Sequence, residues 1–132
     1  MRTFEFKKTY EEVKINDEVY KVDFNDNKVL EYQKAFRSFY SDSQVLHEEG
    51  VGIDKTPEQE KEYYDKSLNL VKGTLEVLIG ENTFDRIYEE SGKSLINMVD
   101  LITFLSDIIQ EKMTSLKEEK TEKYLGKKKR SK

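Results

Sequence analysis

Apolar and polar residues alternate with a period of two near the start of the chain. This period places the apolar side chains of a run on one face of a β-strand. Three such runs occur within residues 3–24, and we predict that they form a β-hairpin or a small antiparallel sheet. The apolar members of the runs are Phe4, Phe6, Val13, Ile15, Tyr20, Val22 and Phe24.

A tight turn is predicted between the last two runs. Asn16 and Asp17 separate them, and both residue types tolerate a positive φ better than most. A sheet of two or three strands is not stable by itself in water. Its apolar face must therefore pack against the remainder of the chain.

From residue 25 onward the apolar residues recur with the period of 3.6 that is typical of α-helices. Four helices are predicted, at about 26–48, 57–79, 83–91 and 94–125, and residues 50–55 are predicted to form a loop. The chain is therefore expected to be an α+β protein, with the small sheet packed on a bundle of helices. The predicted inward residues of the first three helices are Val29, Tyr32, Phe36, Phe39, Tyr40, Leu46, Tyr64, Leu68, Val71, Leu75, Leu78, Phe84, Ile87 and Tyr88.

Residues that cap helices stand at each predicted helix start. The strongest signal is Thr56 before Pro57, because Pro is favoured at the first helical position and Gln59 completes a capping box. The other predicted N-caps are Asn25 or Asp26, Asn82 and Ser94.

The fourth predicted helix carries two apolar stripes at first. They are Leu95, Met98, Ile102, Leu105 and Ile109, and Leu101, Phe104 and Ile108. Such a helix is either the central helix of the core or one that offers a face to a partner helix or a second copy. Both interpretations remain open from the sequence.

Beyond Ile109 this helix becomes mostly charged, and only Met113, Leu116, Tyr124 and Leu125 are apolar. We therefore predict that residues 110–125 project from a single domain at 1–125. The candidate partner-binding residues are Leu101, Phe104, Ile108, Met113 and Leu116.

Length and composition agree with one small domain. The chain has 132 residues, of which 38% are charged, and it contains 7 Phe and 8 Tyr. So many aromatic residues are not expected of a disordered chain. There is no Cys, so no disulfide or thiolate metal site is expected. No apolar run approaches the roughly 20 residues that span a membrane, and no signal-peptide core is present. We expect a location in the cytoplasm.

Charge is distributed unevenly along the chain. Residues 117–132 carry eight Lys or Arg and three Glu, a net +5, which leaves −9 on the rest because the total is −4. The acidic body disfavours binding to nucleic acid, since phosphate repels it. Residues 126–132 are predicted to be a basic flexible tail, which offers the only surface for a nucleic-acid-binding regulator.

Candidate catalytic chemistry is sparse. His47 is the only His, so it lacks the companions that a metal site or a general base needs. The many carboxylates are not placed within apolar runs that would raise their pKa. We therefore predict no catalytic, cofactor-binding or metal-binding residues, and no enzyme. A hydrolase that uses clustered carboxylates is the remaining enzymatic alternative.

The segments 13–24, 27–36, 78–88 and 94–100 together resemble the tail assembly chaperones of long-tailed phages and prophages of Gram-positive bacteria. The resemblance implies a non-enzymatic protein that binds and solubilises the tape measure protein and recruits tail tube subunits. It also implies that the protein works in the bacterial cytoplasm and is absent from the mature virion. The alternative within phages is a small structural or connector protein that stays in the virion.

Many members of that family are made in a short and a longer form by a −1 ribosomal frameshift. Slippage needs a run of repeated nucleotides, and Gly126, Lys127, Lys128 and Lys129 can be encoded as GGA-AAA-AAA-AAR. The resemblance therefore implies that this run is a coding feature of the gene.

Overall fold

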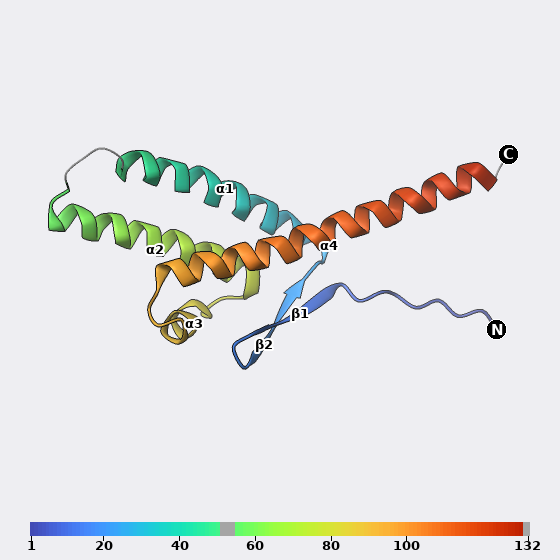
Figure 1. Ribbon diagram of the computed structural model, residues 1–132. Coiled ribbons are helices and arrows are strands. Elements are labelled where there is room, and N and C mark those ends of the chain that lie inside the picture. Colours follow the sequence, from blue (N-terminus) through green and yellow to red (C-terminus); the bar gives the residue numbers. More distant parts are fainter. Residues whose placement is uncertain (51–54, 131–132) are drawn as a thin grey trace.

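The computed structural model describes residues 1–50 and 55–130, with side chains up to Glu118. Two antiparallel strands, β1 (Tyr10–Ile15) and β2 (Glu18–Asp23), precede the helices. Figure 1 shows the hairpin beside one end of the helical body. The helices are α1 (Asp26–Gly50), α2 (Pro57–Ile79), α3 (Phe84–Glu90) and α4 (Leu95–Arg130). The predicted α+β class is confirmed, whereas most of the predicted loop, 51–54, lies outside the described residues.

The hairpin follows the predicted register. Val13 pairs with Tyr20, and Asn16 takes the left-handed conformation, with φ 54°, in the turn. Val13 and Val22 are buried in the common core. The apolar side chains of these two runs therefore face the helices, as the sequence indicates.

The predicted strand through Phe4 and Phe6 is wrong. Residues 1–9 form no strand, and the two phenylalanines are 80% and 91% exposed. The physical reason is the phase of the alternation. In a continuous strand Phe4 and Phe6 would lie on the opposite face from Val13, and that face of the hairpin is not covered by the helices.

Helix α2 is the centre of the structure, because it contacts α1, α3, α4 and β2. Its buried residues combine with residues of every other helix and of the hairpin to form one core. The buried apolar residues are Val13, Val22, Phe24, Tyr32, Val71, Leu75, Leu78, Ile79, Phe84, Ile87, Met98, Ile102, Leu105 and Ile109.

Three of the four predicted helix caps are confirmed. The backbone N–H of Gln59 donates to the Thr56 hydroxyl, and the Gln59 side chain accepts from the Thr56 N–H, so the capping box is complete. Asn25 and Ser94 accept equivalent bonds at the starts of α1 and α4. The prediction of Asn82 as a cap is wrong. Asn82 has a φ of 63°, which suits the preceding turn, and Thr83 is the N-cap of α3.

Helix α4 has two parts. Its first part buries one stripe, formed by Met98, Ile102, Leu105 and Ile109, and Figure 1 shows the second part extending away from the other helices. The helix continues to Arg130 and does not end near Gly126 as predicted. Lys and Arg are good helix formers, and a single Gly costs only about 1 kcal/mol within a helix. The predicted flexible tail is therefore helical through Arg130, and its last two residues are not described.

Gly73 offers a direct test of helix propensity in α2. It is exposed in the interior of the helix, and a Cβ atom at this position would meet no atom within 4 Å. Since Ala is favoured over Gly in a helix by about 1 kcal/mol, Gly73→Ala is expected to raise the free energy of unfolding by about 0.5–1 kcal/mol. Urea unfolding measures this change, and a loss of stability would contradict the open environment of Gly73.

Tyr32 couples the stability of the core to alkaline pH. Burial, assisted by the charge of Asp23, raises its pKa to about 12 from the usual value of about 10. The folded protein therefore retains the phenol proton at a pH where the unfolded chain releases it. This contribution to stability is complete below pH 10 and is lost as the pH rises to about 12. Tyr32→Phe is expected to flatten the fall of unfolding free energy over this range, whereas an unchanged slope would contradict the burial of the phenol.

Candidate partner-binding site

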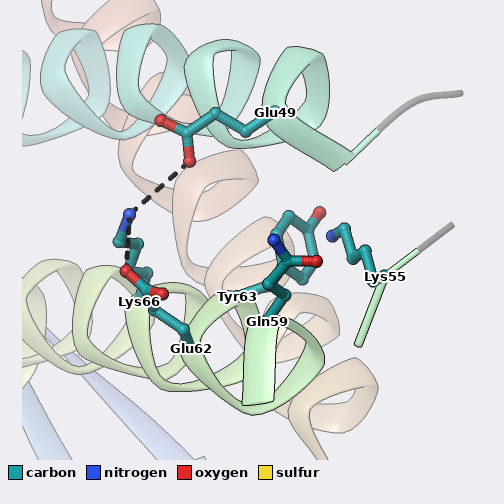
Figure 2. A pocket seen from close by; sticks show the side chains of 6 residues that line it. All are labelled: Glu49, Lys55, Gln59, Glu62, Tyr63 and Lys66. Carbon is teal, nitrogen blue, oxygen red and sulfur yellow. Dashed lines mark ion pairs between the residues drawn. The ribbon is translucent and has the colours of Figure 1, made fainter. Parts of the chain in front are cut away.

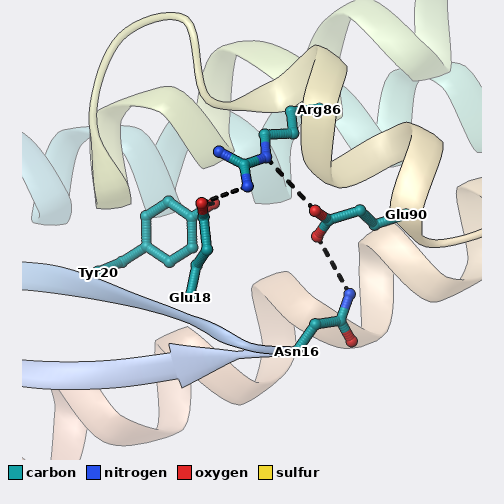
Figure 3. Close-up of polar contacts among 5 residues, drawn as sticks. All are labelled: Asn16, Glu18, Tyr20, Arg86 and Glu90. Carbon is teal, nitrogen blue, oxygen red and sulfur yellow. Dashed lines mark hydrogen bonds and ion pairs between the residues drawn. The ribbon is translucent and has the colours of Figure 1, made fainter.

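The hairpin is fixed to α3 by a polar cluster (Figure 3). Arg86 forms ion pairs with Glu18 and Glu90, and the Asn16 side chain donates to Glu90 at 3.2 Å. The Tyr20 hydroxyl donates to Glu18 at 2.9 Å. The charge of Glu18 raises the pKa of Arg86, and partial burial raises that of Tyr20. Both carboxylates are thus engaged by cations or donors, so the cluster serves to hold the hairpin in place.

A second polar cluster joins the end of α1 to the start of α2 (Figure 2). Lys66 lies between Glu49 and Glu62, at 3.7 and 3.5 Å. The Lys55 ammonium lies 3.7 Å from the centre of the Tyr63 ring. Opposite charges therefore compensate one another along this acidic part of the sequence, and the contacts bring the two helix ends together.

Potential metal ligands do not converge in the described part of the chain. His47 lies exposed in the last turn of α1. Among the described residues there is no group of three or more His, Cys, Asp or Glu side chains arranged to hold a metal ion. Within the same ranges, no helix has the length and apolarity required to cross a bilayer.

The most extensive hollow that lies on predicted partner-binding residues is a groove between α1 and α4. We define this α1–α4 groove by its lining residues. From α1 these are Gln33, Phe36, Arg37, Phe39 and Tyr40, and from α4 they are Ile102, Thr103, Ser106, Gln110 and Met113. Its volume is about 760 Å³.

The chemistry of the groove differs from the composition of the chain as a whole, of which 38% is charged. Phe36, Phe39 and Met113 are half-buried and pack against the core, whereas Tyr40 is 68% exposed. Most of the polar lining residues are uncharged, and Arg37 is the one charged residue among those that line the groove. The groove thus combines apolar side chains with neutral hydrogen-bonding groups.

The length of the groove matches a helical ligand. Its α4 wall extends from Ile102 to Met113, which corresponds to about 16 Å at 1.5 Å per residue. A helix of three turns has a similar length. An amphipathic helix that binds in a groove presents apolar side chains at intervals of three and four residues, and the half-buried aromatic residues of α1 offer contacts for them.

A smaller depression lies on the other side of α4, between the hairpin and α3. It has a volume of about 470 Å³ and includes Leu101 and Phe104. Phe104 is 49% exposed. Acidic and amide side chains, among them Glu90, Asn97 and Asp100, line the same depression, so it is less apolar than the α1–α4 groove.

The five predicted partner-binding residues are therefore distributed over α4. Leu101 and Phe104 belong to the hairpin-side depression, and Met113 belongs to the α1–α4 groove. Ile108 is half-buried against the core, and Leu116 is 42% exposed on the projecting part.

The aromatic residues of α1 that line the groove, Phe36, Phe39 and Tyr40, are predicted from the sequence to face the core. Their heptad-like spacing indicates an apolar stripe, but it does not reveal that α4 leaves the end of this stripe open.

The last turns of α4 include Gly126, Lys127, Lys128 and Lys129. Only the backbone is described there. The coding role implied for this run stays a prediction.

Comparisons with known proteins identify one family. The family described as a family of unknown function (DUF6673) matches residues 16–132. The match includes β2, all four described helices and every residue that lines the α1–α4 groove. Comparison with curated proteins and with solved structures gave no match.

Proposed function

We propose that this chain, which belongs to the DUF6673 family of unknown function, is a non-enzymatic phage tail assembly chaperone. In this role it binds an apolar helical stretch of the tape measure protein in the α1–α4 groove and recruits tail tube subunits. The observation that carries the proposal is the open groove, in which Arg37 is the one charged lining residue, on an otherwise highly charged protein. The assignment to tail assembly comes from the sequence resemblance.

The physical need for such a protein follows from the chemistry of its proposed ligand. Long apolar helical stretches aggregate when they are exposed to water. A chaperone that covers the apolar stripe of such a stretch removes this stripe from water. The solvent then contacts the outer surface of the chaperone. Here 38% of the residues of the chain are charged and its net charge is −4, and repulsion between coated chains opposes aggregation.

The projecting part of α4 extends the binding surface beyond the groove. Met113 lines the groove, and Leu116 is 42% exposed one turn further along. Residues three apart are neighbours on a helix surface. A ligand helix longer than the groove would therefore continue along α4, which gives the exposed Leu116 a contact that the isolated protein lacks.

Co-expression with the tape measure protein of the same phage or prophage tests this function. The tape measure protein is expected to be soluble and to co-purify with the chain, and to precipitate when expressed alone. Virions purified from the same phage are expected to lack the chain. An insoluble tape measure protein despite co-expression, or the chain as a stoichiometric virion component, would overturn the proposal, and the second result would favour a structural subunit.

A further inference from the structure

The α1–α4 groove contains a cation that has no acidic partner. Arg37 is exposed and lines the groove. Among the described residues, no carboxylate forms an ion pair with its guanidinium group. The residues three or four positions away on α1 are neutral or basic: Gln33, Lys34, Tyr40 and Ser41. The helix itself therefore supplies no acid at the spacing that forms ion pairs.

The opposite wall of the groove offers Arg37 no carboxylate either. The α4 residues that line the groove are uncharged, and Asp107 and Glu111 of the same helix line a different depression. The side chains of Thr103 and Gln110 both donate to groups of α4 itself. Arg37, with five N–H donors, is therefore the strongest hydrogen-bonding group that the groove presents to a ligand.

Arg37 lies at the rim of the groove and not in its floor. Phe36 and Phe39 pack against the core, whereas Arg37 and Tyr40 are exposed. Since Arg37 and Tyr40 are three residues apart, they are neighbours on one face of α1. A ligand helix that lies on the two phenylalanines would therefore place the edge of its apolar face beside Arg37.

We infer that the ligand of the groove is an amphipathic helix with an Asp or Glu at the edge of its apolar face that lies along α1, where the carboxylate binds Arg37. This inference rests on the proposed function, because it takes the groove as the site that binds the tape measure protein. An Arg side chain binds a carboxylate through two parallel N–H···O bonds. A ligand without this acid would cover a charge that has no partner, which is costly.

The same contact selects the direction in which the ligand helix binds. Turning the helix end to end keeps its apolar face on the groove but exchanges its two edges. An acid on one edge then lies along α4, where no cation lines the groove. A helix with acids on one edge alone is therefore expected to bind in one direction.

Synthetic helices test the inference without the tape measure protein. Three peptides of roughly 18 residues, long enough to form a helix, share one stripe of Leu and carry Glu, Gln or Lys along one edge of it. The Glu peptide is expected to bind about tenfold more tightly than the Lys peptide, measured by fluorescence anisotropy. The net charge of −4 would favour the opposite order, so the measurement separates pairing with Arg37 from general attraction.

Variants of the chain assign the preference to one residue. Arg37→Gln is expected to abolish the difference between the Glu and Lys peptides, and Arg37→Glu to reverse it. Lys34→Gln is the matched control, because it also removes a cation of α1 but at a position that does not line the groove. It is expected to keep the preference for the Glu peptide.

The outcomes distinguish this inference from the proposed function. Peptides that do not bind, equal binding of the three peptides, or a preference for Glu that survives in Arg37→Glu would each overturn the inference. Co-purification of the tape measure protein alongside such a result would leave the proposed function in place. A preference for Glu that requires Arg37, together with a tape measure protein that does not bind, would support the inference and overturn the role in tail assembly.

Discussion

Leu105→Ala is expected to lower the free energy of unfolding by about 3 kcal/mol, which is typical of a fully buried leucine that leaves a cavity. The Leu105 side chain is 0% exposed, and it lies in the stripe by which α4 closes the core. Equilibrium unfolding in urea measures the loss. A variant with nearly unchanged stability would contradict the packing of α4 on the bundle.

The matched control lies on the same helix. Leu116→Ala makes the same change of residue type at a position that is 42% exposed, and its effect on unfolding is expected to stay within about 0.5 kcal/mol. The difference between the two variants separates the packed part of α4 from its projecting part. Equal effects would mean that the projecting part belongs to the core.

Two carboxylates introduced into the α1–α4 groove are expected to weaken binding of the tape measure protein by about 100-fold. Thr103→Glu with Gln110→Glu changes two exposed groove residues. An apolar ligand helix would then bury two carboxylates in a groove that holds one cation, Arg37, and burying a charge without a partner is costly. Binding measured by calorimetry or by co-purification yield reports the loss, and circular dichroism confirms that the variant is folded.

The control for this variant carries the same added charge at another place. Gln44→Glu with Asn69→Glu also changes two exposed residues, and neither residue lines the groove or lies on α4. Binding is expected to stay within about twofold of the original, because distant surface charges are screened by salt. Equal losses in both variants would show that net charge, and not the groove, governs binding.

Local signals in the sequence predict much of the fold. The Thr56 capping box and the turn at Asn16 depend on neighbouring residues alone, and the structure confirms both. The prediction of a strand at Phe4 and Phe6 is wrong because alternation shows only that a segment can be a strand. In a strand continuous with β1, the two phenylalanines would lie on the face that the helices leave uncovered, and this depends on residues far from the segment. The predicted end of α4 near Gly126 is also wrong. The helix propensity of the residues on both sides outweighs the cost of one glycine, and the helix continues to Arg130.

The groove was harder to predict than the fold. Its two walls come from helices that are far apart in the sequence, and its position depends on where α4 crosses the bundle. The periodicity of α1 identifies Phe36, Phe39 and Tyr40 as one stripe, but not that Tyr40 is left 68% exposed. The sequence did indicate excess apolar surface on α4, and Met113 is the predicted residue that lies in the groove.

Hydrogen exchange of the chain with and without the tape measure protein tests the central claim most directly. The proposal predicts slower exchange in residues 33–40 of α1 and 102–118 of α4 when the partner is bound. The start of α2, residues 57–66, lies at the far end of α1 and is expected to exchange at the same rate in both states. Protection confined to α2, or no protection in α1 and α4 despite a stable complex, would contradict the assignment of the groove.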